Sequence, residues 1–423
     1  MKIIHRQVSK YFKGFIIFSA SFIVFAFLSL RYFQSLQVLH YGTYSAVRSG
    51  EKFLSYQPGG QGWNNQRIAL EHAVVFAKLL NRTLILQPVS EHPLGQDMVG
   101  KLKINGYEAY NLMKQSNLLP ISRIIDLHHL SNFLPVIENV KPHPEFIREF
   151  SHFSRTDICH SVAYGFWVDR RAETEREKSI LEDQFFREKN DMLGKCKQSR
   201  ITSKANKYVP IVKYIFPDLL SDQSDILYFS EGTFFAIDVR FFNEDSARAA
   251  QYWISHYIRY NPGIITTVDK FTSELPSNYC CIHARRTFYH RSYLTWQYFL
   301  RLTDTLGCNE GRVLYIATDL LENEFFDHFN SYKLINATSL TPYINFNNIP
   351  PAFHQTYLGI HEQLVCVHSS VFVPSNHSTL SYYVHRVRGE VPQIDGLLIK
   401  HIYFYFIEHY VDKIISKFYI KKA

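Results

Sequence analysis

The feature that most restricts the fold of this 423-residue chain is an alternation of short apolar runs with longer helical patterns after Pro262-Gly263. Strands that alternate with helices favour a parallel sheet covered on both faces. The pattern predicts strands over residues 279–284, 313–318, 334–336 and 371–374, and helices over residues 293–306, 320–329, 357–367 and 379–387.

A similar pattern opens the first half of the chain. It predicts a strand at 53–56, a glycine-rich turn, a helix at 64–80 and a second strand at 83–86, which together make a βαβ unit. The stretch from 90 to 260 is less regular, with predicted helices at 107–114 and 245–260. We therefore expect an α/β protein with two Rossmann-type domains, at residues 51–262 and 263–390, followed by a C-terminal tail at 391–423.

The N-terminus carries an uncharged apolar run that Arg31 closes and that four basic residues precede: Lys2, Arg6, Lys10 and Lys13. A membrane-crossing helix needs about 17 to 25 apolar residues, and basic flanks favour the cytosolic side. A cleavable signal peptide is the alternative, but no A-x-A-like site follows the run. We predict a single-pass type II protein of the Golgi or endoplasmic reticulum membrane, with a cytosolic tail at 1–13, a transmembrane signal-anchor at 14–31, a stem at 32–50 and a lumenal remainder.

Two further features agree with a lumenal position. Sequons for N-glycosylation begin at Asn81, Asn336 and Asn376. Six cysteines, an even number, can pair in an oxidising lumen, although free buried thiols remain the alternative. Six cysteines allow 15 connectivities, so the sequence assigns no pair. The cysteines are Cys159, Cys196, Cys280, Cys281, Cys308 and Cys366.

The net charge of +8 is concentrated at the two ends of the chain. The basic N-terminus and the lysine-rich tail supply most of it, so the folded body is much closer to neutral. A nucleic-acid-binding function loses its main support for that reason. In the tail, Glu408 and Asp412 argue against a second membrane span, so the tail packs on the first domain or lies on a membrane surface.

The first motif with chemical meaning is the glycine-rich turn from Gly59 to Gly62, which leads into Asn64 and Asn65. Glycines allow close approach of a ligand to the backbone, and the helix that follows offers unpaired N–H groups to an anion. The turn is not a dinucleotide fingerprint, because Asn65 stands where the third glycine belongs, and no Gly-Lys-Ser/Thr follows. A plain glycine turn before a helix remains the alternative.

The second motif places His283, Arg285 and Arg286 at the carboxyl end of the strand predicted at 279–284. Ligands of open α/β sheets bind outside the carboxyl ends of the strands. Arginine suits a diphosphate because its planar fork stays charged and forms paired hydrogen bonds. An arginine aimed at a leaving nucleoside diphosphate lowers the barrier without a metal. A surface arginine pair is the alternative.

The third motif lies between the last predicted strand and the last predicted helix and contains Ser378 and Thr379. Hydroxyls at a helix start can donate to a phosphate, although helix capping explains them equally well. No Asp-x-Asp occurs, and Val365 replaces the second histidine of an H-E-x-x-H pattern that begins at His361-Glu362. We therefore predict no metal site.

Together these segments resemble the GDP-fucose protein O-fucosyltransferase family. The similarity runs in order from about residue 55 to residue 390. It is carried by the segments 59–71, 77–84, 118–123, 283–286, 315–319, 363–366, 378–379 and 388–389.

The resemblance implies a GT-B fold, in which two Rossmann-type domains face a cleft, and an inverting, metal-independent transfer of fucose. GDP-fucose would be the donor, a protein or glycan hydroxyl the acceptor, and no cofactor would be needed. By the family pattern Arg285 is the catalytic residue that holds the donor β-phosphate, and Arg286 assists it. The other expected donor-binding residues are His283, Ser378 and Thr379 in the second half and Gly62, Asn64 and Asn65 in the first.

Two alternatives stay open. Another nucleotide sugar can occupy the same cleft, or the chain can be a non-catalytic, membrane-anchored binding protein of the same fold. The second gains weight from Phe288, which stands where an aspartate often follows in the family. The general base is unassigned, because Glu71 and His72 are expected to be structural helix residues.

Overall fold

The computed structural model describes part of the chain, which divides into two compact units, Met1–Glu51 and Lys52–Ala423. Only Gly50 and Glu51 of the first unit are described, so the fold below is that of the second, and the signal-anchor predicted at 14–31 lies outside the described residues. Among the described helices, none is long and apolar enough to cross a bilayer. The described residues are 50–58, 62–91, 118–141, 153–158, 164–168, 212–215, 219–229, 234, 238–241, 244–285, 295–319, 323–375, 378–389 and 397–398.

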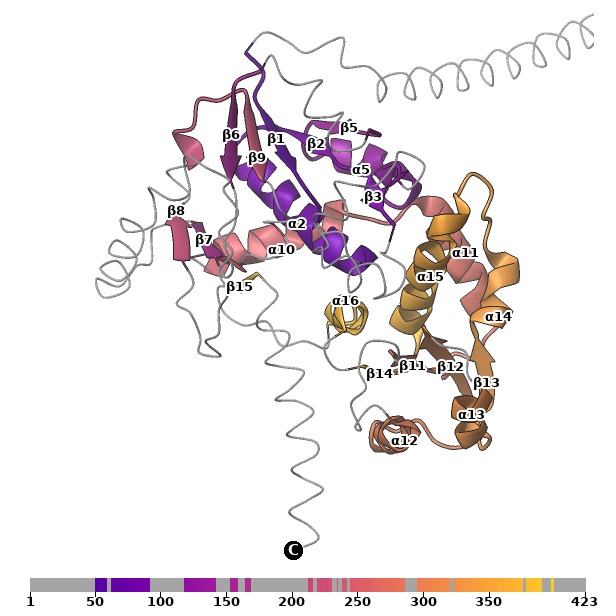
Figure 1. Cartoon of the computed structure of the whole chain (residues 1–423). Coiled ribbons are helices and arrows are strands. Elements are labelled where there is room, and N and C mark those ends of the chain that lie inside the picture. Colours follow the sequence, from indigo (N-terminus) through magenta and orange to yellow (C-terminus); the bar gives the residue numbers. More distant parts are fainter. Residues whose placement is uncertain are drawn as a thin grey trace, which may run out of the picture. The chain divides into compact units, whose positions relative to one another are not determined.

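The first sheet is wholly parallel, with the strand order β5-β2-β1-β9-β6 (Figure 1). Every residue of β1, β2 and β9 is buried, as expected for the central strands of a parallel sheet. The strands are β1 (Phe53–Tyr56), β2 (Thr83–Leu86), β5 (Val136–Glu138), β6 (Arg155–Ile158) and β9 (Ile226–Phe229). The βαβ unit predicted from the sequence is confirmed, with both strand ranges as expected.

Helix α2 (Trp63–Leu79) connects β1 to β2 and packs on both strands. It begins after Gly62, which provides no side-chain cap, and most of its length is buried. Its boundaries differ by one residue from the predicted 64–80. Asn81 follows in the left-handed region at φ 51°, a conformation that asparagine tolerates better than most residues, and turns the chain into β2.

The second sheet is also parallel, with the order β13-β12-β11-β14. Helix α15 packs on β11 and β12, and α12 packs on β11 and β14, so helices cover both faces (Figure 1). These elements are β11 (Cys280–Ala284), α12 (Trp296–Thr305), β12 (Val313–Thr318), β13 (Lys333–Asn336), α15 (His354–His368), β14 (Val371–Val373) and α16 (Thr379–Val387). The alternation predicted for this half is confirmed, and most strand limits agree within one residue.

The described short helices between these strands are α13 (Asn323–Phe326), η4 (Asp327–Phe329), α14 (Ala337–Leu340), η5 (Thr341–Tyr343) and η6 (Pro351–Phe353). Those of the first half are η3 (Ile121–Arg123), α5 (Leu127–Ser131) and α10 (Glu244–Tyr257). The predicted helix at 320–329 is thus divided into α13 and η4 in its described part, while the helix predicted at 107–114 lies outside the described residues.

Among the described helices, the longest one that was not predicted is α11 (Pro262–Ser273). It begins where the sequence suggested a break between two halves. Asn261 is its N-cap and accepts a hydrogen bond from the Gly263 backbone N–H at 2.9 Å, with Pro262 in the first turn. Proline is well tolerated there, because the first helical N–H groups have no partner within the helix. The Pro-Gly pair therefore starts an element instead of separating two.

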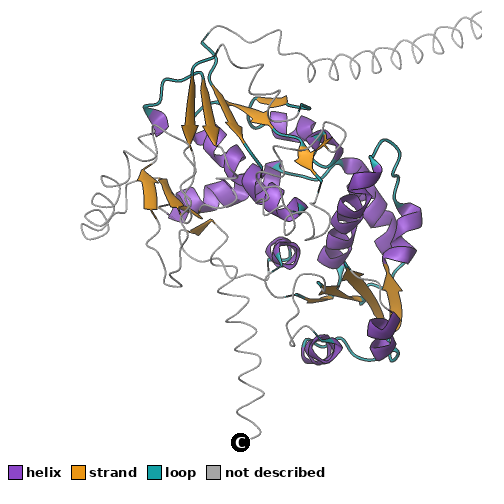
Figure 2. Ribbon diagram, in the orientation of Figure 1, coloured by secondary structure: helices purple, strands orange, loops and turns teal. Residues whose placement is uncertain are grey.

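The remaining strands lie in two small sheets (Figure 2). The larger has the order β15-β10-β7-β8 and is parallel except for the antiparallel pairing of β15 with β10. Strand β15 holds the only described residues of the predicted C-terminal tail, and these two residues pair with a strand of the first half. These strands are β3 (Val89–Ser90), β4 (Leu118–Leu119), β7 (Tyr164–Val168), β8 (Val212–Ile215), β10 (Asp238–Phe241) and β15 (Leu397–Leu398).

Two disulfides start from neighbouring residues of β11. Cys280 bonds to Cys308, just beyond α12, and Cys281 bonds to Cys366 of α15, with Cα–Cα distances of 6.2 and 5.2 Å. Successive side chains of a strand point to opposite faces of the sheet, so the two bonds join β11 to the helical layers on both sides. Pairing is thus found for four of the six cysteines, whereas Cys159 and Cys196 lie outside the described residues.

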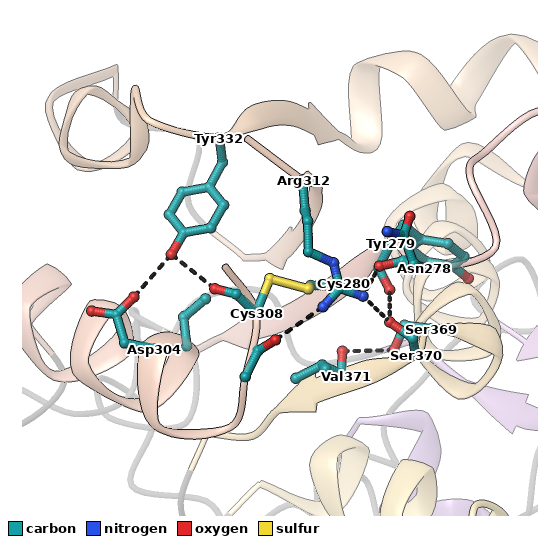
Figure 3. The surroundings of a disulfide bond; sticks show 12 residues. Asn278, Tyr279, Cys280, Asp304, Cys308, Arg312, Tyr332, Ser369, Ser370 and Val371 are labelled. Atoms are coloured by element: carbon teal, nitrogen blue, oxygen red, sulfur yellow. Dashed lines mark hydrogen bonds between the residues drawn. A yellow bond between two sulfur atoms is a disulfide. The ribbon is translucent and has the colours of Figure 1, made fainter. Parts of the chain in front are cut away.

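Arg312 binds the same amino end of the second sheet (Figure 3). Its guanidinium donates to the Gly307 carbonyl at 3.0 Å, to the Ser370 hydroxyl at 2.6 Å and to the Asn278 carbonyl. Nearby, the Tyr332 hydroxyl lies 3.1 Å from the Cys308 carbonyl. A covalent bond and several side-chain hydrogen bonds therefore stabilise the amino end of β11 and of the strands beside it.

Candidate functional site

The carboxyl end of β11 is joined to the start of α16 by three hydrogen bonds. The His283 Nδ1 lies 2.8 Å from the Ser381 hydroxyl, and the Ser381 Oγ accepts a bond from the Ser375 N–H at 2.9 Å. The Ser375 Oγ in turn accepts from the Arg285 N–H at 2.9 Å. Because β11 and β14 are neighbouring parallel strands, their carboxyl ends meet at one edge, and two of the predicted motifs come together there.

Ser378 is the N-cap of α16, and its Oγ accepts a hydrogen bond from the Leu380 N–H at 3.3 Å. Thr379 is the first residue of the helix. The capping interpretation of this motif is therefore correct for Ser378. A capping hydroxyl accepts through its oxygen and keeps its own hydrogen, so it can still donate to an anion at the helix start. Arg286 lies outside the described residues.

His283 is buried and carries no charge at neutral pH. Burial, and after it the nearby positive charge of Arg285, lower the pKa of His283 to about 3, although Asp319 acts in the opposite direction. An imidazole with so low a pKa cannot supply a positive charge to a diphosphate. Arg285 is therefore the cationic residue among the described members of this motif. His283 has a structural role, because its ring binds the Ser381 hydroxyl of α16.

Glu362 is a buried carboxyl group close to the same strands. It lies on α15, and its Oε1 accepts a hydrogen bond from the Tyr315 hydroxyl of β12 at 3.3 Å. Burial raises the pKa of Glu362 to about 8; the Tyr315 hydrogen bond lowers it, and the charge of Asp319 raises it further. The group is thus largely protonated at neutral pH. The sequence showed this residue as part of a failed zinc pattern and did not assign it a role.

In the first half, the predicted residues Gly62, Asn64 and Asn65 surround the start of α2. The Gly62 carbonyl accepts a hydrogen bond from the Asn65 N–H at 3.0 Å. The Asn64 Oδ1 is buried and has no hydrogen-bond partner within the described part of the chain. A buried acceptor without a partner costs stability unless a water or a ligand binds it, which makes this oxygen a candidate contact.

A cluster of charged and aromatic side chains joins α2 to α16, and the sequence analysis did not find it. Arg67 of α2 contacts two tyrosines, with its guanidinium carbon 4.7 Å from the ring centre of Tyr260 and 4.5 Å from that of Tyr383. The Arg67 Nε donates to Glu71 at 2.9 Å. Arg386, near the end of α16, binds both oxygens of Glu71, at 2.7 and 2.5 Å.

This cluster determines the protonation state of Glu71. Burial raises the pKa of the carboxyl group, but the charges and hydrogen bonds of Arg386 and Arg67 outweigh it and lower the pKa to about 2. A carboxylate that two guanidiniums hold is a poor proton acceptor. His72 is also engaged, because its Nδ1 lies 2.5 Å from the buried Phe234 carbonyl. Both residues are structural, as the sequence suggested, and neither is a candidate general base.

Tyr260 connects this cluster to α15. Its hydroxyl accepts hydrogen bonds from the Trp63 Nε1 at 3.1 Å and from the Gln363 Nε2 at 2.9 Å. The predicted residues at the start of α2 thus adjoin a packed network that reaches α15 and α16. The structure links the two predicted groups of site residues through α16, which contacts β11 at its beginning and α2 near its end.

No group of three or more metal-binding side chains occurs among the described residues. At the carboxyl end of β11, the backbone of Arg285 is bonded to Ser375, in the segment that leads into α16, and arginines near helix starts commonly bind anions.

The sequence profile described as "GDP-fucose protein O-fucosyltransferase" matches residues 53–290, more than half of the chain. No curated protein matches significantly.

Among solved structures, POFUT1 in complex with GDP-fucose is 13% identical, with 83% of this chain and 97% of that chain covered and a TM-score of 0.42. The fucosyltransferase NodZ from Bradyrhizobium is also 13% identical, with 82% and 99% covered and a TM-score of 0.41. Both TM-scores lie below 0.5, so the sequence profile carries the weight of the comparison.

Proposed function

Because the chain belongs to the GDP-fucose protein O-fucosyltransferase family, and is therefore a glycosyltransferase, we propose that it transfers fucose from GDP-fucose to a hydroxyl of a protein or glycan. The observation that supports this most is the connection of Arg285 with the first turn of α16 through Ser375 and Ser381. An arginine whose backbone is bonded to the segment before a helix start is suited to a diphosphate, because its planar fork and the helix N–H groups can bind the same anion.

In the proposed reaction the bond between the anomeric carbon of fucose and the β-phosphate oxygen breaks as the acceptor oxygen attacks from the opposite side. Negative charge develops on the departing GDP. Arg285, assisted by Arg286, neutralises that charge, while the N–H groups at the start of α16 and the Ser378 hydroxyl donate to the phosphate oxygens. The reaction inverts the anomeric centre and uses neither a metal nor a cofactor.

The remaining donor contacts are assigned to His283, Thr379, Gly62, Asn64 and Asn65. The unpartnered Asn64 oxygen supports a ligand contact at the start of α2. Glu71 is unsuitable as the base that accepts the acceptor's proton, because two arginines stabilise its ionised form. The proton of the acceptor hydroxyl is therefore taken up by another residue of this chain or by a group of the bound acceptor.

We assign the folded part to the lumen of the Golgi or endoplasmic reticulum, with the signal-anchor at 14–31 as a type II membrane anchor. The two disulfides on β11 support an oxidising compartment, because such bonds are rare where glutathione and thioredoxin keep thiols reduced.

The proposal is tested by thermal unfolding of the full-length protein, purified from a secretory host, in the presence of single nucleotides and nucleotide sugars. A ligand at 100 times its Kd stabilises a protein by about 2.7 kcal/mol. GDP and GDP-fucose are expected to raise the Tm, UDP is not, and Arg285→Ala is expected to remove most of the effect. Arg301→Ala, which alters an exposed arginine of α12, is the matched control.

A Tm that neither GDP nor GDP-fucose changes would contradict the proposal. Stabilisation by a different nucleotide sugar would favour a glycosyltransferase with another donor. Stabilisation by GDP-fucose without release of GDP in the presence of glycoprotein acceptors would favour the non-catalytic binding protein.

A further inference from the structure

We infer that Glu71 and Arg386 are a positioning pair, which holds α16 at the angle that donor binding requires. The inference rests on the proposed function, because it concerns the same anion site. Neither residue is expected to touch the donor. Arg386 lies in the last turn of α16, whereas the site lies at the first turn of that helix.

Helix α16 is short and is attached near both of its ends. Near the beginning, Ser381 binds the side chain of His283 and the backbone of Ser375. Near the end, Arg386 forms two hydrogen bonds with Glu71 of α2. The two attachments lie on different parts of the molecule, the second sheet and the first helix. The direction of α16 therefore depends on both.

The Glu71–Arg386 pair contributes more to the orientation of α16 than to the stability of the folded protein. The side chains of Glu71 and Arg67 are 5% and 4% exposed, and that of Arg386 is 27% exposed, so the carboxylate is almost fully removed from water. A buried ion pair gives little net stability compared with apolar residues of similar size, because desolvation offsets the attraction. Its two-point fork, however, allows only a narrow range of angles, which an apolar contact would not impose.

Two tyrosines stabilise the excess positive charge of this cluster. Arg67 and Arg386 together carry one more positive charge than Glu71 balances. The faces of Tyr260 and Tyr383 lie against the Arg67 guanidinium, and aromatic faces attract cations. Tyr383 belongs to α16, so its contact with Arg67 also joins this helix to α2. Arg386 makes its contact with Glu71 of α2 about one turn later in the same helix.

The consequence for the site follows from the geometry of a helix. Ser378 and Arg386 are eight positions apart, which corresponds to roughly 12 Å along the helix at 1.5 Å per residue. A tilt of α16 at its Arg386 end moves the Ser378 end, and displacements of about 1 Å at a reacting group are enough to lower a rate strongly. Loss of the pair should therefore weaken donor binding although no donor contact is removed.

The test compares Arg386→Gln and Arg386→Lys with a matched control, Asp222→Asn. Asp222 forms an ion pair with buried Arg82 at 3.1 Å and accepts a hydrogen bond from the Ser224 N–H, next to strands β2 and β9 of the first sheet. Two quantities are measured for each full-length protein: the hydrogen exchange of the α16 backbone amides without ligand, and the Kd for GDP. The lysine variant keeps the charge but loses the fork, and it remains informative if the glutamine variant does not fold.

We expect Arg386→Gln to speed exchange in the first turn of α16 and to raise the Kd for GDP about tenfold, equivalent to 1.4 kcal/mol. Arg386→Lys should lie between this variant and the wild type. Asp222→Asn should lower the Tm and leave both α16 exchange and the Kd unchanged.

Unchanged exchange in α16 of both Arg386 variants would overturn the inference, whether or not GDP binds. Faster exchange with an unchanged Kd, in a protein that binds GDP, would also overturn it. Faster exchange in a protein whose wild type binds no GDP would support the attachment of α16 by this pair and contradict the proposed function instead.

Discussion

The two ends of β11 are held in different ways. At the amino end, Cys280 is covalently bonded to Cys308, and Arg312 joins three neighbouring segments through hydrogen bonds. At the carboxyl end, His283 and Arg285 are held by hydrogen bonds of Ser381 and Ser375. The amino end of β11 is thus held by a covalent bond, whereas its carboxyl end is held by hydrogen bonds.

The difference shows how stability and function can be separated along a single strand. Changes at the amino end should affect mainly the free energy of unfolding. Changes at the carboxyl end should affect mainly the binding of a diphosphate, since Arg285 and the segment that leads into α16 meet there.

The largest effect is expected from removal of the Cys280–Cys308 bond. Loss of a native disulfide costs about 2–5 kcal/mol of stability. The double variant Cys280→Ala/Cys308→Ala should unfold at a clearly lower Tm in a calorimetric scan. Below that temperature its Kd for GDP should stay near the wild-type value. A large loss of affinity in the folded variant would show that the two ends are not independent.

Arg285→Ala should weaken GDP binding and leave the Tm almost unchanged, which is the reverse of the disulfide variant. Hydrogen bonds to charged groups contribute about 1.5–3 kcal/mol, so the Kd for GDP should rise roughly tenfold to a hundredfold. The Tm without ligand should change little, because the backbone N–H that binds Ser375 is retained. Calorimetric titration measures the first quantity, and an unchanged Kd would remove Arg285 from the donor site.

Ser381→Ala tests the connection between the two motifs. The change removes the hydroxyl that binds both the Ser375 N–H and the His283 Nδ1, and buried groups left without a partner cost about 1–3 kcal/mol. We expect a moderate fall in Tm together with weaker GDP binding. Thr305→Ala, which removes an exposed hydroxyl bonded to a helix carbonyl, is the control and should change neither quantity.

The last prediction concerns Glu362 and the pH dependence of stability. Its pKa is about 8 in the folded protein against an ordinary value of 4.5, so the folded state holds this proton more tightly than the unfolded state does. The contribution of Glu362 to stability is therefore complete below pH 4.5 and declines as the pH rises to about 8. The decline is at most about 1.4 kcal/mol per pH unit.

Glu362→Gln removes this dependence. Urea unfolding between pH 5 and pH 9 should show that the variant becomes more stable relative to the wild type as the pH rises. Parallel curves for the two proteins would mean that the carboxyl group is ionised in the folded state.

Much of the fold could be predicted because local patterns specify it. Strands β1, β2 and β12 are short apolar runs bounded by turn residues, and their ranges agree with the prediction. Helix α16 agrees as well, because Ser378 marks its start. Helix α11 was missed since Pro262-Gly263 was interpreted as a break, although Asn261 and Pro262 together form a helix-start signal.

The candidate site could be predicted only in part. The three motifs were visible as local sequence, and two of them meet at β11 and α16. The Arg67–Glu71 pair is local and has helical spacing, but Arg386 is 315 residues away from Glu71, and nothing in the sequence connects them. The disulfide pairs were undetermined for the same reason, because distant partners depend on how the sheets pack.

The central claim is that the carboxyl end of β11 and the start of α16 form the diphosphate site. A crystal structure of the protein with GDP tests it most directly. The account predicts that the β-phosphate lies against the Arg285 guanidinium and the first backbone N–H groups of α16, within hydrogen-bond distance of both. GDP bound elsewhere, or with its phosphates turned away from Arg285, would contradict it.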